Sequence, residues 1–226
     1  MIDVLYSRAG IATQIVINNV LVDIGDGTLR DLLAAEYDFE TLDVIVITHG
    51  HYDHVGGLHT LLGYLRMIGR KKTLKILHPG ACEVNTLVGG FENCYGDTIP
   101  FKIDLICVKD RKMYHFDNVK IQPFFVSHAG STAQGIMPSI PATGYRIFLE
   151  DRIVAVTGDS CMCEALKELV SGADTAFIEA TWTEERKEML TKKYGDMESD
   201  ILSVHLSVEQ AEGLGKLAKE YVLIHT

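Results

Sequence analysis

Short apolar runs alternate with helical patterns along most of the chain. Apolar runs, some of them alternating with polar residues, predict strands at residues 3–6, 13–18, 20–23, 44–48, 73–77, 102–108, 119–127, 144–149, 152–157, 175–179 and 221–224. Apolar residues at helical spacing predict helices at residues 28–35, 55–69, 81–88, 162–171 and 207–219. We expect residues 91–100 and 130–142 to be loops, since glycine and proline interrupt both patterns there.

The predicted strands form blocks that helices separate. Such an order favours an α/β protein in which two sheets pack together with helices outside. The chain has 226 residues, of which 47% are hydrophobic, and no low-complexity segment or Pro/Ser linker divides it. We therefore expect one domain over residues 1–226, although two fused halves that share a core fit the same pattern.

Charge and cysteine content narrow the function classes. The formal net charge of −10 gives a surface that does not attract nucleic acid by itself, so a polyanionic substrate would need a local positive field. Two divalent ions would supply that field. The cysteines are odd in number, which favours reduced thiols: Cys82, Cys94, Cys107, Cys161 and Cys163. With no signal peptide and no long apolar run, we expect a cytoplasmic protein without a membrane partner.

The strongest chemical signal follows the apolar strand at residues 44–48. His49, His51, Asp53 and His54 lie within six residues, and two glycines come next. Buried imidazoles and carboxylates need partners, which a metal ion would provide. His49 and His51 point the same way in extended backbone, whereas Asp53 and His54 face a neighbouring position. Mixed imidazole and carboxylate ligands suit zinc, with iron and manganese as alternatives. A polar cluster that caps the following helix is the simpler alternative.

This HxHxDH motif with its two glycines resembles the signature of the metallo-β-lactamase superfamily. The resemblance implies a four-layer αββα sandwich of two mixed β-sheets. It also implies further ligands at distant strand ends, and His128, Asp159 and His225 each follow a predicted strand.

In that family one ion would be held by the side chains of His49, His51, His128 and Asp159. The other would be held by Asp53, His54, Asp159 and His225, so that Asp159 bridges both. Asp23 resembles the early aspartate of the family, which accepts hydrogen bonds that orient the ligand loop. A turn residue before Gly25 is the alternative for Asp23.

Three further segments resemble the ribonuclease Z branch. They are Gly144-Tyr145-Arg146, Glu179-Ala180-Thr181, and His205-Leu206-Ser207 followed by Leu223-Ile224-His225. The resemblance implies a metal-dependent phosphodiesterase or endoribonuclease of tRNA processing, in which two ions hold a hydroxide between them. His205 is then free to protonate the leaving group and Glu179 to orient it, and with Asp53 they form the predicted catalytic set. Alternatively, His205 only decorates the start of a helix whose N-cap is Ser207.

The substrate is less well defined. The chain lacks the long Gly/Pro/Lys-rich arm with which ribonuclease Z enzymes grip tRNA. Transfer RNA, a shorter RNA end, a cyclic nucleotide or another phosphodiester all stay open, and so does a homodimer. A thioester or lactone hydrolase of the glyoxalase II type is the alternative enzyme, and a catalytically silent scaffold is the alternative outside enzymology.

Overall fold

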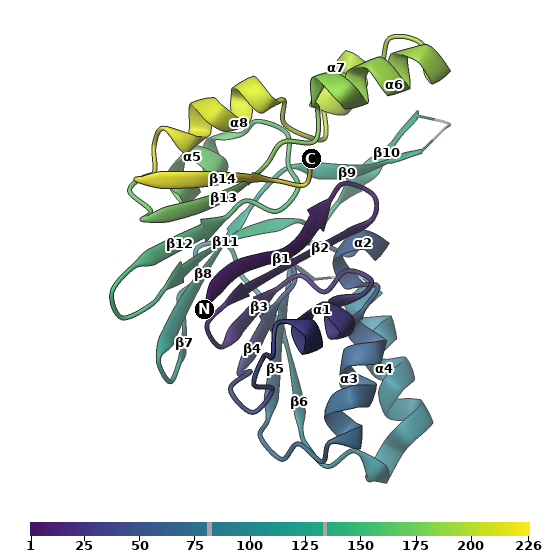
Figure 1. Ribbon diagram of the computed structural model, residues 1–226, viewed down its shortest axis with the longest axis vertical. Coiled ribbons are helices and arrows are strands. Elements are labelled where there is room, and N and C mark those ends of the chain that lie inside the picture. Colours follow the sequence, from purple (N-terminus) through teal and green to yellow (C-terminus); the bar gives the residue numbers. More distant parts are fainter. Residues whose placement is uncertain (81–82, 133–134) are drawn as a thin grey trace. The chain divides into compact units, whose positions relative to one another are not determined.

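Two compact units make up the chain in the computed structural model, which describes residues 1–80, 83–132 and 135–226. The units comprise residues 1–108 and 109–226. Each contains a six-stranded mixed sheet with helices attached (Figure 1). The predicted α/β class with two mixed sheets is confirmed, whereas the single domain over residues 1–226 stays a prediction. No helix in the described ranges has the length and apolar character needed to cross a membrane.

The first unit has its strands in sequence order across the sheet. They are β1 (Ile2–Arg8), β2 (Ala12–Ile17), β3 (Val20–Val22), β4 (Val44–Val46), β5 (Leu74–His78) and β6 (Ile103–Cys107). The first three strands pair antiparallel, and β3 to β6 are parallel. The carboxyl ends of the four parallel strands therefore meet at one edge, where the HxHxDH motif begins.

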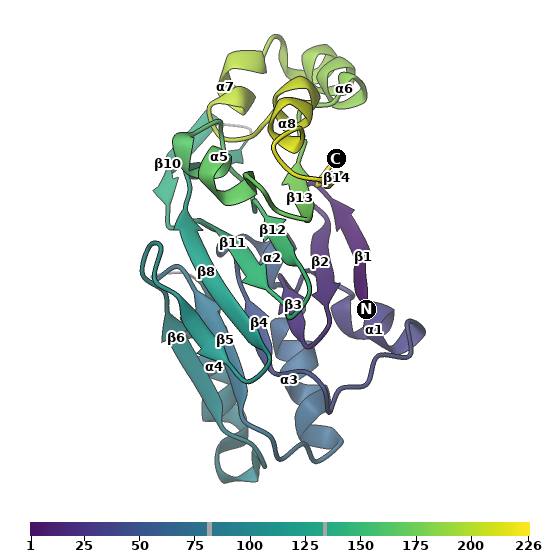
Figure 2. The same cartoon turned by 90° about the vertical axis from the view of Figure 1, so that its left-hand side faces the viewer.

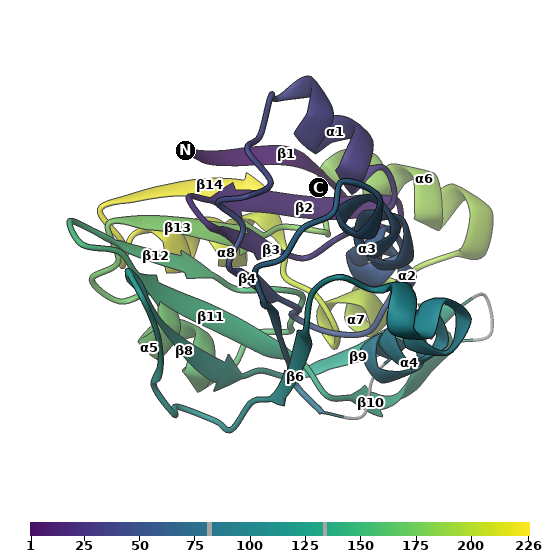
Figure 3. The same ribbon diagram turned by 90° about the horizontal axis from the view of Figure 1, so that it is seen from below.

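Helices of this unit share one core with the sheet. They are α1 (Thr28–Ala34), α2 (Tyr52–Val55), α3 (Leu58–Met67), α4 (Glu83–Tyr95) and the short 3-10 helix η1 (Gly96–Thr98). Leu21 and Ile45 of the sheet pack with Leu61 of α3 and Phe91 of α4 in this core. Figure 3 shows α3 and α4 next to each other on the helical side of the unit.

The second unit has strand order β14-β13-β12-β11-β8-β7. These are β7 (Tyr114–Phe116), β8 (Val119–Phe125), β11 (Thr143–Phe148), β12 (Ile153–Val156), β13 (Thr175–Glu179) and β14 (Glu220–Ile224). β12, β13 and β14 are parallel, and β11 is antiparallel to both β8 and β12, so β8 runs in the direction of β12 (Figure 2). Four strands thus deliver their carboxyl ends to the same edge.

Four helices and a ribbon complete the second unit. The helices are α5 (Glu164–Val170), α6 (Glu184–Tyr194), α7 (Glu198–Leu202) and α8 (Val208–Gly215). Leu169 of α5 and Leu214 of α8 pack on Ala155 and Ile178 of the sheet. The ribbon consists of β9 (His128–Thr132) and β10 (Gly135–Ile140), which form a separate two-stranded sheet among the described residues.

One helix prediction and one loop prediction need correction. The helix predicted at residues 55–69 is interrupted at Gly56–Gly57, which separate α2 from α3. The Gly57 amide donates its hydrogen bond to the Ile24 carbonyl at 2.9 Å and not to a carbonyl of the same helix. The predicted loop at residues 91–100 is wrong over its first half, since α4 continues to Tyr95. Phe91 continues the buried stripe of Val84 and Val88 at helical spacing, which the adjacent glycines had obscured.

The loop predicted at residues 130–142 is also wrong, because most of it forms the β9–β10 ribbon. Its strands are mostly exposed and lack alternation of apolar and polar residues, and Pro138 is tolerated because each strand of a two-stranded ribbon is an edge. β7, α6 and α7 were not predicted; no residue of α6 is buried, so α6 leaves no apolar stripe in the sequence. Some predictions fall on residues 81–82 and 133–134, including Cys82, which lie outside the described residues.

Candidate metal centre

Asp23 and the HxHxDH loop meet at one edge of the first sheet because β3 and β4 are parallel neighbours. The amide of Asp23 donates to the Val46 carbonyl at 2.9 Å, and the amide of Ile24 donates to the His54 carbonyl at 2.7 Å. Gly57 then packs directly on Gly25, where an added Cβ would lie 2.4 Å from a carbonyl oxygen. The second glycine after the motif is therefore required by this close backbone approach.

The buried Asp23 carboxylate accepts three hydrogen bonds from Thr48 and His54. Oδ1 accepts from the Thr48 amide at 2.8 Å, and Oδ2 accepts from Thr48 Oγ1 at 2.8 Å and from His54 Nδ1 at 2.7 Å. Because a carboxylate has no proton to give, His54 must carry its hydrogen on Nδ1. A metal ion would then bind His54 through Nε2.

Thr48 fixes the neighbouring histidine in the same way. Its only hydroxyl hydrogen goes to Asp23, so Oγ1 accepts from His49 Nδ1 at 3.1 Å. His49 Nε2 then lies 2.9 Å from His51 Nδ1. Because the hydrogen of His49 is on Nδ1, its Nε2 accepts this hydrogen bond from His51 Nδ1. The two rings are therefore held next to each other, and His51 would offer Nε2 to a metal ion.

Asp53 is held by the turn between β1 and β2. The Gly10 amide donates to Asp53 Oδ2 at 2.9 Å, and the hydroxyl of Tyr52 donates to the Gly10 carbonyl at 2.7 Å. His54 Nε2 lies 3.9 Å from the same Asp53 oxygen. The carboxylate is thus oriented by backbone on one side and lies beside an imidazole on the other.

In the second unit, predicted ligands follow strands that end at the same edge. Asp159 follows β12 and His225 follows β14. His128 was predicted to come directly after the strand at residues 119–127, but it is the first residue of β9. Asp159 Oδ2 lies 3.9 Å from His128 Nε2 and 3.4 Å from His225 Nε2. His128 Nδ1 donates to the Val204 carbonyl at 2.8 Å, which leaves Nε2 with its lone pair. One carboxylate oxygen of Asp159 is thus close to the Nε2 atoms of two histidines.

Glu179, at the end of β13, is fully buried and accepts four hydrogen bonds. Oε1 accepts from the Ser160 amide, the Leu206 amide and His205 Nδ1, each at 3.1 Å, and Oε2 accepts from the Thr181 amide at 3.0 Å. These four donors hold the Glu179 carboxylate in one orientation.

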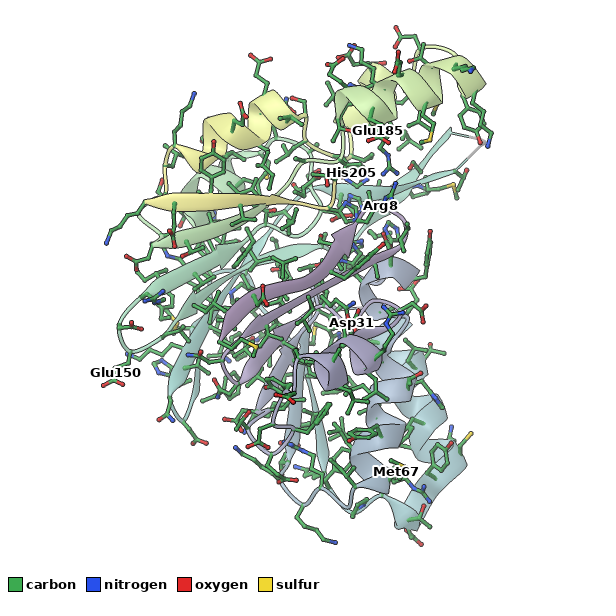
Figure 4. The ribbon with its side chains drawn as sticks, viewed as in Figure 1. Arg8, Asp31, Met67, Glu150, Glu185 and His205 are labelled. Atoms are coloured by element: carbon green, nitrogen blue, oxygen red, sulfur yellow. The ribbon has the colours of Figure 1, made fainter. Side chains whose placement is uncertain are left out.

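His205 lies in the segment between α7 and α8, beside the ends of β13 and β14 (Figure 4). Burial by itself would lower its pKa, but the charge and hydrogen bond of Glu179 outweigh burial and raise the pKa above its ordinary value. Ser207, not His205, caps α8 by accepting from the Gln210 amide at 3.1 Å. Glu179 therefore favours the protonated, imidazolium form of His205.

The contacts of Gly144 and Arg146 in the Gly144-Tyr145-Arg146 segment include close packing against α5. Tyr145 is buried in β11, and Arg146 Nη1 donates to the carbonyls of Glu168 and Leu169 at 3.1 and 3.3 Å, at the end of α5. A Cβ on Gly144 would lie 2.4 Å from the side chain of Leu169. The segment thus fixes α5 against the sheet.

Two threonines that touch the histidines were missed by sequence reasoning, Thr48 and Thr181. Each hydroxyl lies within 3.2 Å of a ring nitrogen. The signal was adjacency, since Thr48 directly precedes the HxHxDH motif and Thr181 ends the Glu-Ala-Thr segment. Imidazoles and carboxylates held by such partners form a donor set that fits a divalent metal.

Comparisons with known proteins show the family of this chain. Residues 18–226 match the beta-lactamase superfamily domain. Ribonuclease Z of Bradyrhizobium sp. (strain ORS 278) is 27% identical over 232 residues, which cover 84% of this chain and 76% of that protein. Ribonuclease Z of Ignicoccus hospitalis is 27% identical over 207 residues, covering 74% and 67%.

A solved structure shows the same fold. The short form of human tRNase Z superposes with a TM-score of 0.75 at 20% identity, covering 99% of this chain and 92% of that one. The domain match over residues 18–226 shows that the chain belongs to the metallo-β-lactamase superfamily, and within that superfamily its sequence is similar to ribonuclease Z.

Proposed function

We propose that this protein is a metal-dependent phosphodiesterase of the ribonuclease Z type that hydrolyses RNA. The observation that carries the proposal is the buried Glu179–His205 pair, whose His205 Nδ1 lies 3.9 Å from Asp159 Oδ2. An imidazolium beside a predicted ligand is suited to protonate a leaving alkoxide. The ribonuclease Z relatives support this choice within a superfamily of many hydrolases.

We assign the metal ligands by the resemblance together with the tautomers. They are His49, His51, Asp53 and His54 from the first unit and His128, Asp159 and His225 from the second. Asp159 would serve two divalent ions, with zinc favoured over manganese or iron. When bound, such ions supply Lewis acidity, activate water and offset the charge of the phosphoryl group.

Several side chains have roles that follow from their own contacts. His205 gives its Nε2 proton to the departing oxygen, while Glu179 keeps the ring oriented and charged. Asp23 holds His54 in its ligand tautomer. The Gly10 amide fixes the carboxylate of Asp53, which belongs to both the ligand set and the catalytic set.

A thioester substrate would make less use of these residues. A thiolate leaves without a proton because its pKa is far below that of an alkoxide, so the Glu179–His205 pair would have no part in that reaction. The net charge of −10 also bears on substrate size, since a long RNA gains affinity mainly from cationic side chains that contact phosphates. We therefore favour a short RNA end over a whole precursor tRNA.

Steady-state kinetics on a panel of substrates tests the proposal. The zinc-loaded protein is expected to hydrolyse bis(p-nitrophenyl) phosphate and a short RNA with a 3′ extension faster than a glutathione thioester or a β-lactam. On RNA, kcat/KM should be lower for a full precursor tRNA than for the short RNA. Efficient thioester hydrolysis without cleavage of either phosphodiester would contradict the proposed function and leave the fold intact.

A further inference from the structure

Backbone pairing places Thr181 between His205 and His225. The Ala180 amide donates to the Ile224 carbonyl at 2.9 Å, which continues the pairing of β13 with β14. The Trp182 amide donates to the Leu206 carbonyl at 3.0 Å. Thr181 lies between these two backbone hydrogen bonds. It therefore faces His225, which follows Ile224, and His205, which precedes Leu206.

Thr181 Oγ1 lies within hydrogen-bond distance of three groups on those two histidines. The distances are 2.8 Å to His225 Nδ1, 3.2 Å to the His225 carbonyl oxygen and 3.2 Å to His205 Nδ1. Thr181 is only 1% exposed, so these protein groups surround a hydroxyl that is shielded from solvent.

The single hydrogen of the hydroxyl decides how these contacts are shared. A carbonyl oxygen can only accept, so the Thr181 hydrogen goes to the carbonyl of His225 and both lone pairs of Oγ1 are left to accept. The shorter contact, at 2.8 Å, is then a hydrogen bond donated by His225 Nδ1. His225 consequently keeps its lone pair on Nε2, the atom that lies 3.4 Å from Asp159 Oδ2.

Thr181 also contacts the backbone of His225 at an unusual conformation. The φ of His225 is 56°, in the left-handed region that residues with a Cβ adopt rarely. Thr181 contacts both the carbonyl and the ring of this one residue and so fixes the two together. The other accepting lone pair faces His205 Nδ1, which donates mainly to Glu179 at 3.1 Å.

We propose that Thr181 is a positioning residue whose hydroxyl selects the Nδ1–H tautomer of His225 and thereby prepares Nε2 as a metal ligand. The inference rests on the proposed metal centre and names a residue on which that centre depends. His54 and His128 are fixed by a carboxylate and by a backbone carbonyl, which can only accept. At His225 the same task falls to a side-chain hydroxyl, which one substitution removes.

Two variants of Thr181 test this. Thr181→Val keeps the shape of the side chain and removes the hydroxyl, and Thr181→Ser keeps the hydroxyl. Zinc affinity is measured by competition with a chromophoric chelator. Thr181→Val is expected to bind its weaker zinc ion about 10–100-fold less tightly than the wild type, the usual effect of losing a hydrogen bond to a ligand. Thr181→Ser is expected to stay within about threefold of the wild type, on the same reasoning.

Nitrogen-15 NMR of the metal-free protein with labelled histidine reads the tautomer directly, at a pH where the imidazoles are neutral. Wild type and Thr181→Ser should show hydrogen on Nδ1 of His225, and Thr181→Val should show a mixture of tautomers. His128 serves as an internal control, because its partner is a backbone carbonyl and its tautomer should not change.

The outcomes are separable from those of the substrate panel because neither measurement uses RNA. Unchanged zinc affinity in a folded Thr181→Val protein would overturn the proposal, and so would an equal loss in Thr181→Ser. If Thr181→Val does not fold, the wild-type spectrum still decides, since hydrogen on Nε2 of His225 contradicts the assignment by itself.

Discussion

At the scale of single residues, a His205 variant tests proton transfer without removing a proposed metal ligand. Glu179 raises the pKa of His205, and neither residue is among the seven proposed ligands. His205→Ala should therefore retain its metal but lose RNA cleavage by about 10²–10⁴-fold, the usual contribution of a general acid. The loss should be much smaller on bis(p-nitrophenyl) phosphate, because nitrophenolate departs without a proton. Parallel kcat measurements on the two substrates test this.

An exposed histidine provides the matched control. His115 lies on β7 with its side chain exposed, so His115→Ala should leave both rates unchanged. An equal loss on good and poor leaving groups in His205→Ala would instead show that the ring binds substrate or supports the fold.

At the scale of elements, Arg70 ties the loop before β4 to the end of α3. The buried guanidinium donates to the carbonyls of Phe39 at 2.8 Å, Leu42 at 2.5 Å and Lys72 at 2.9 Å. Arg70→Met should lower the free energy of unfolding by about 2–4 kcal/mol, because buried carbonyls lose their donors at about 1–3 kcal/mol each. Urea denaturation measures the change through the midpoint.

Arg70→Lys distinguishes charge from geometry. An ammonium group keeps the charge but cannot reproduce the planar fork that reaches several carbonyls, so part of the stability should be lost. A midpoint for Arg70→Met that equals the wild type would mean that water satisfies these carbonyls and that the guanidinium does not hold the loop.

Sequence patterns predicted buried elements better than exposed elements. β13 was predicted with its observed bounds because all five of its residues are buried and apolar side chains dominate it. β10 and α6 escaped prediction because neither has a buried residue, and an element without a buried face leaves no periodic signal.

At the scale of the whole molecule, metal binding should contribute to stability. The purified protein is expected to hold close to two divalent ions per chain. Chelation should lower the melting temperature and added zinc should restore it, because a ligand at about 100 times its Kd stabilises by about 2.7 kcal/mol. Plasma mass spectrometry and thermal unfolding measure both effects. An active preparation without any transition metal would contradict the metal-centre assignment.

The sequence by itself determined the residue types and their order along the chain. His49, His51, Asp53 and His54 are adjacent in sequence, so their spacing was sufficient to predict a metal site. His128, Asp159 and His225 were named through the resemblance to the metallo-β-lactamase superfamily, which places further ligands at strand ends, and each follows a predicted strand. Local spacing and strand ends are properties that a linear pattern carries.

Only the tertiary structure decided which partner holds each side chain. The carbonyl of Val204 fixes His128 across 76 positions of sequence, and Thr181 reaches His225 across 44. It also showed that Gly144 and Arg146 contact α5. Hydrogen-bond partners depend on positions in space and on which atom carries a proton, and a sequence pattern specifies neither.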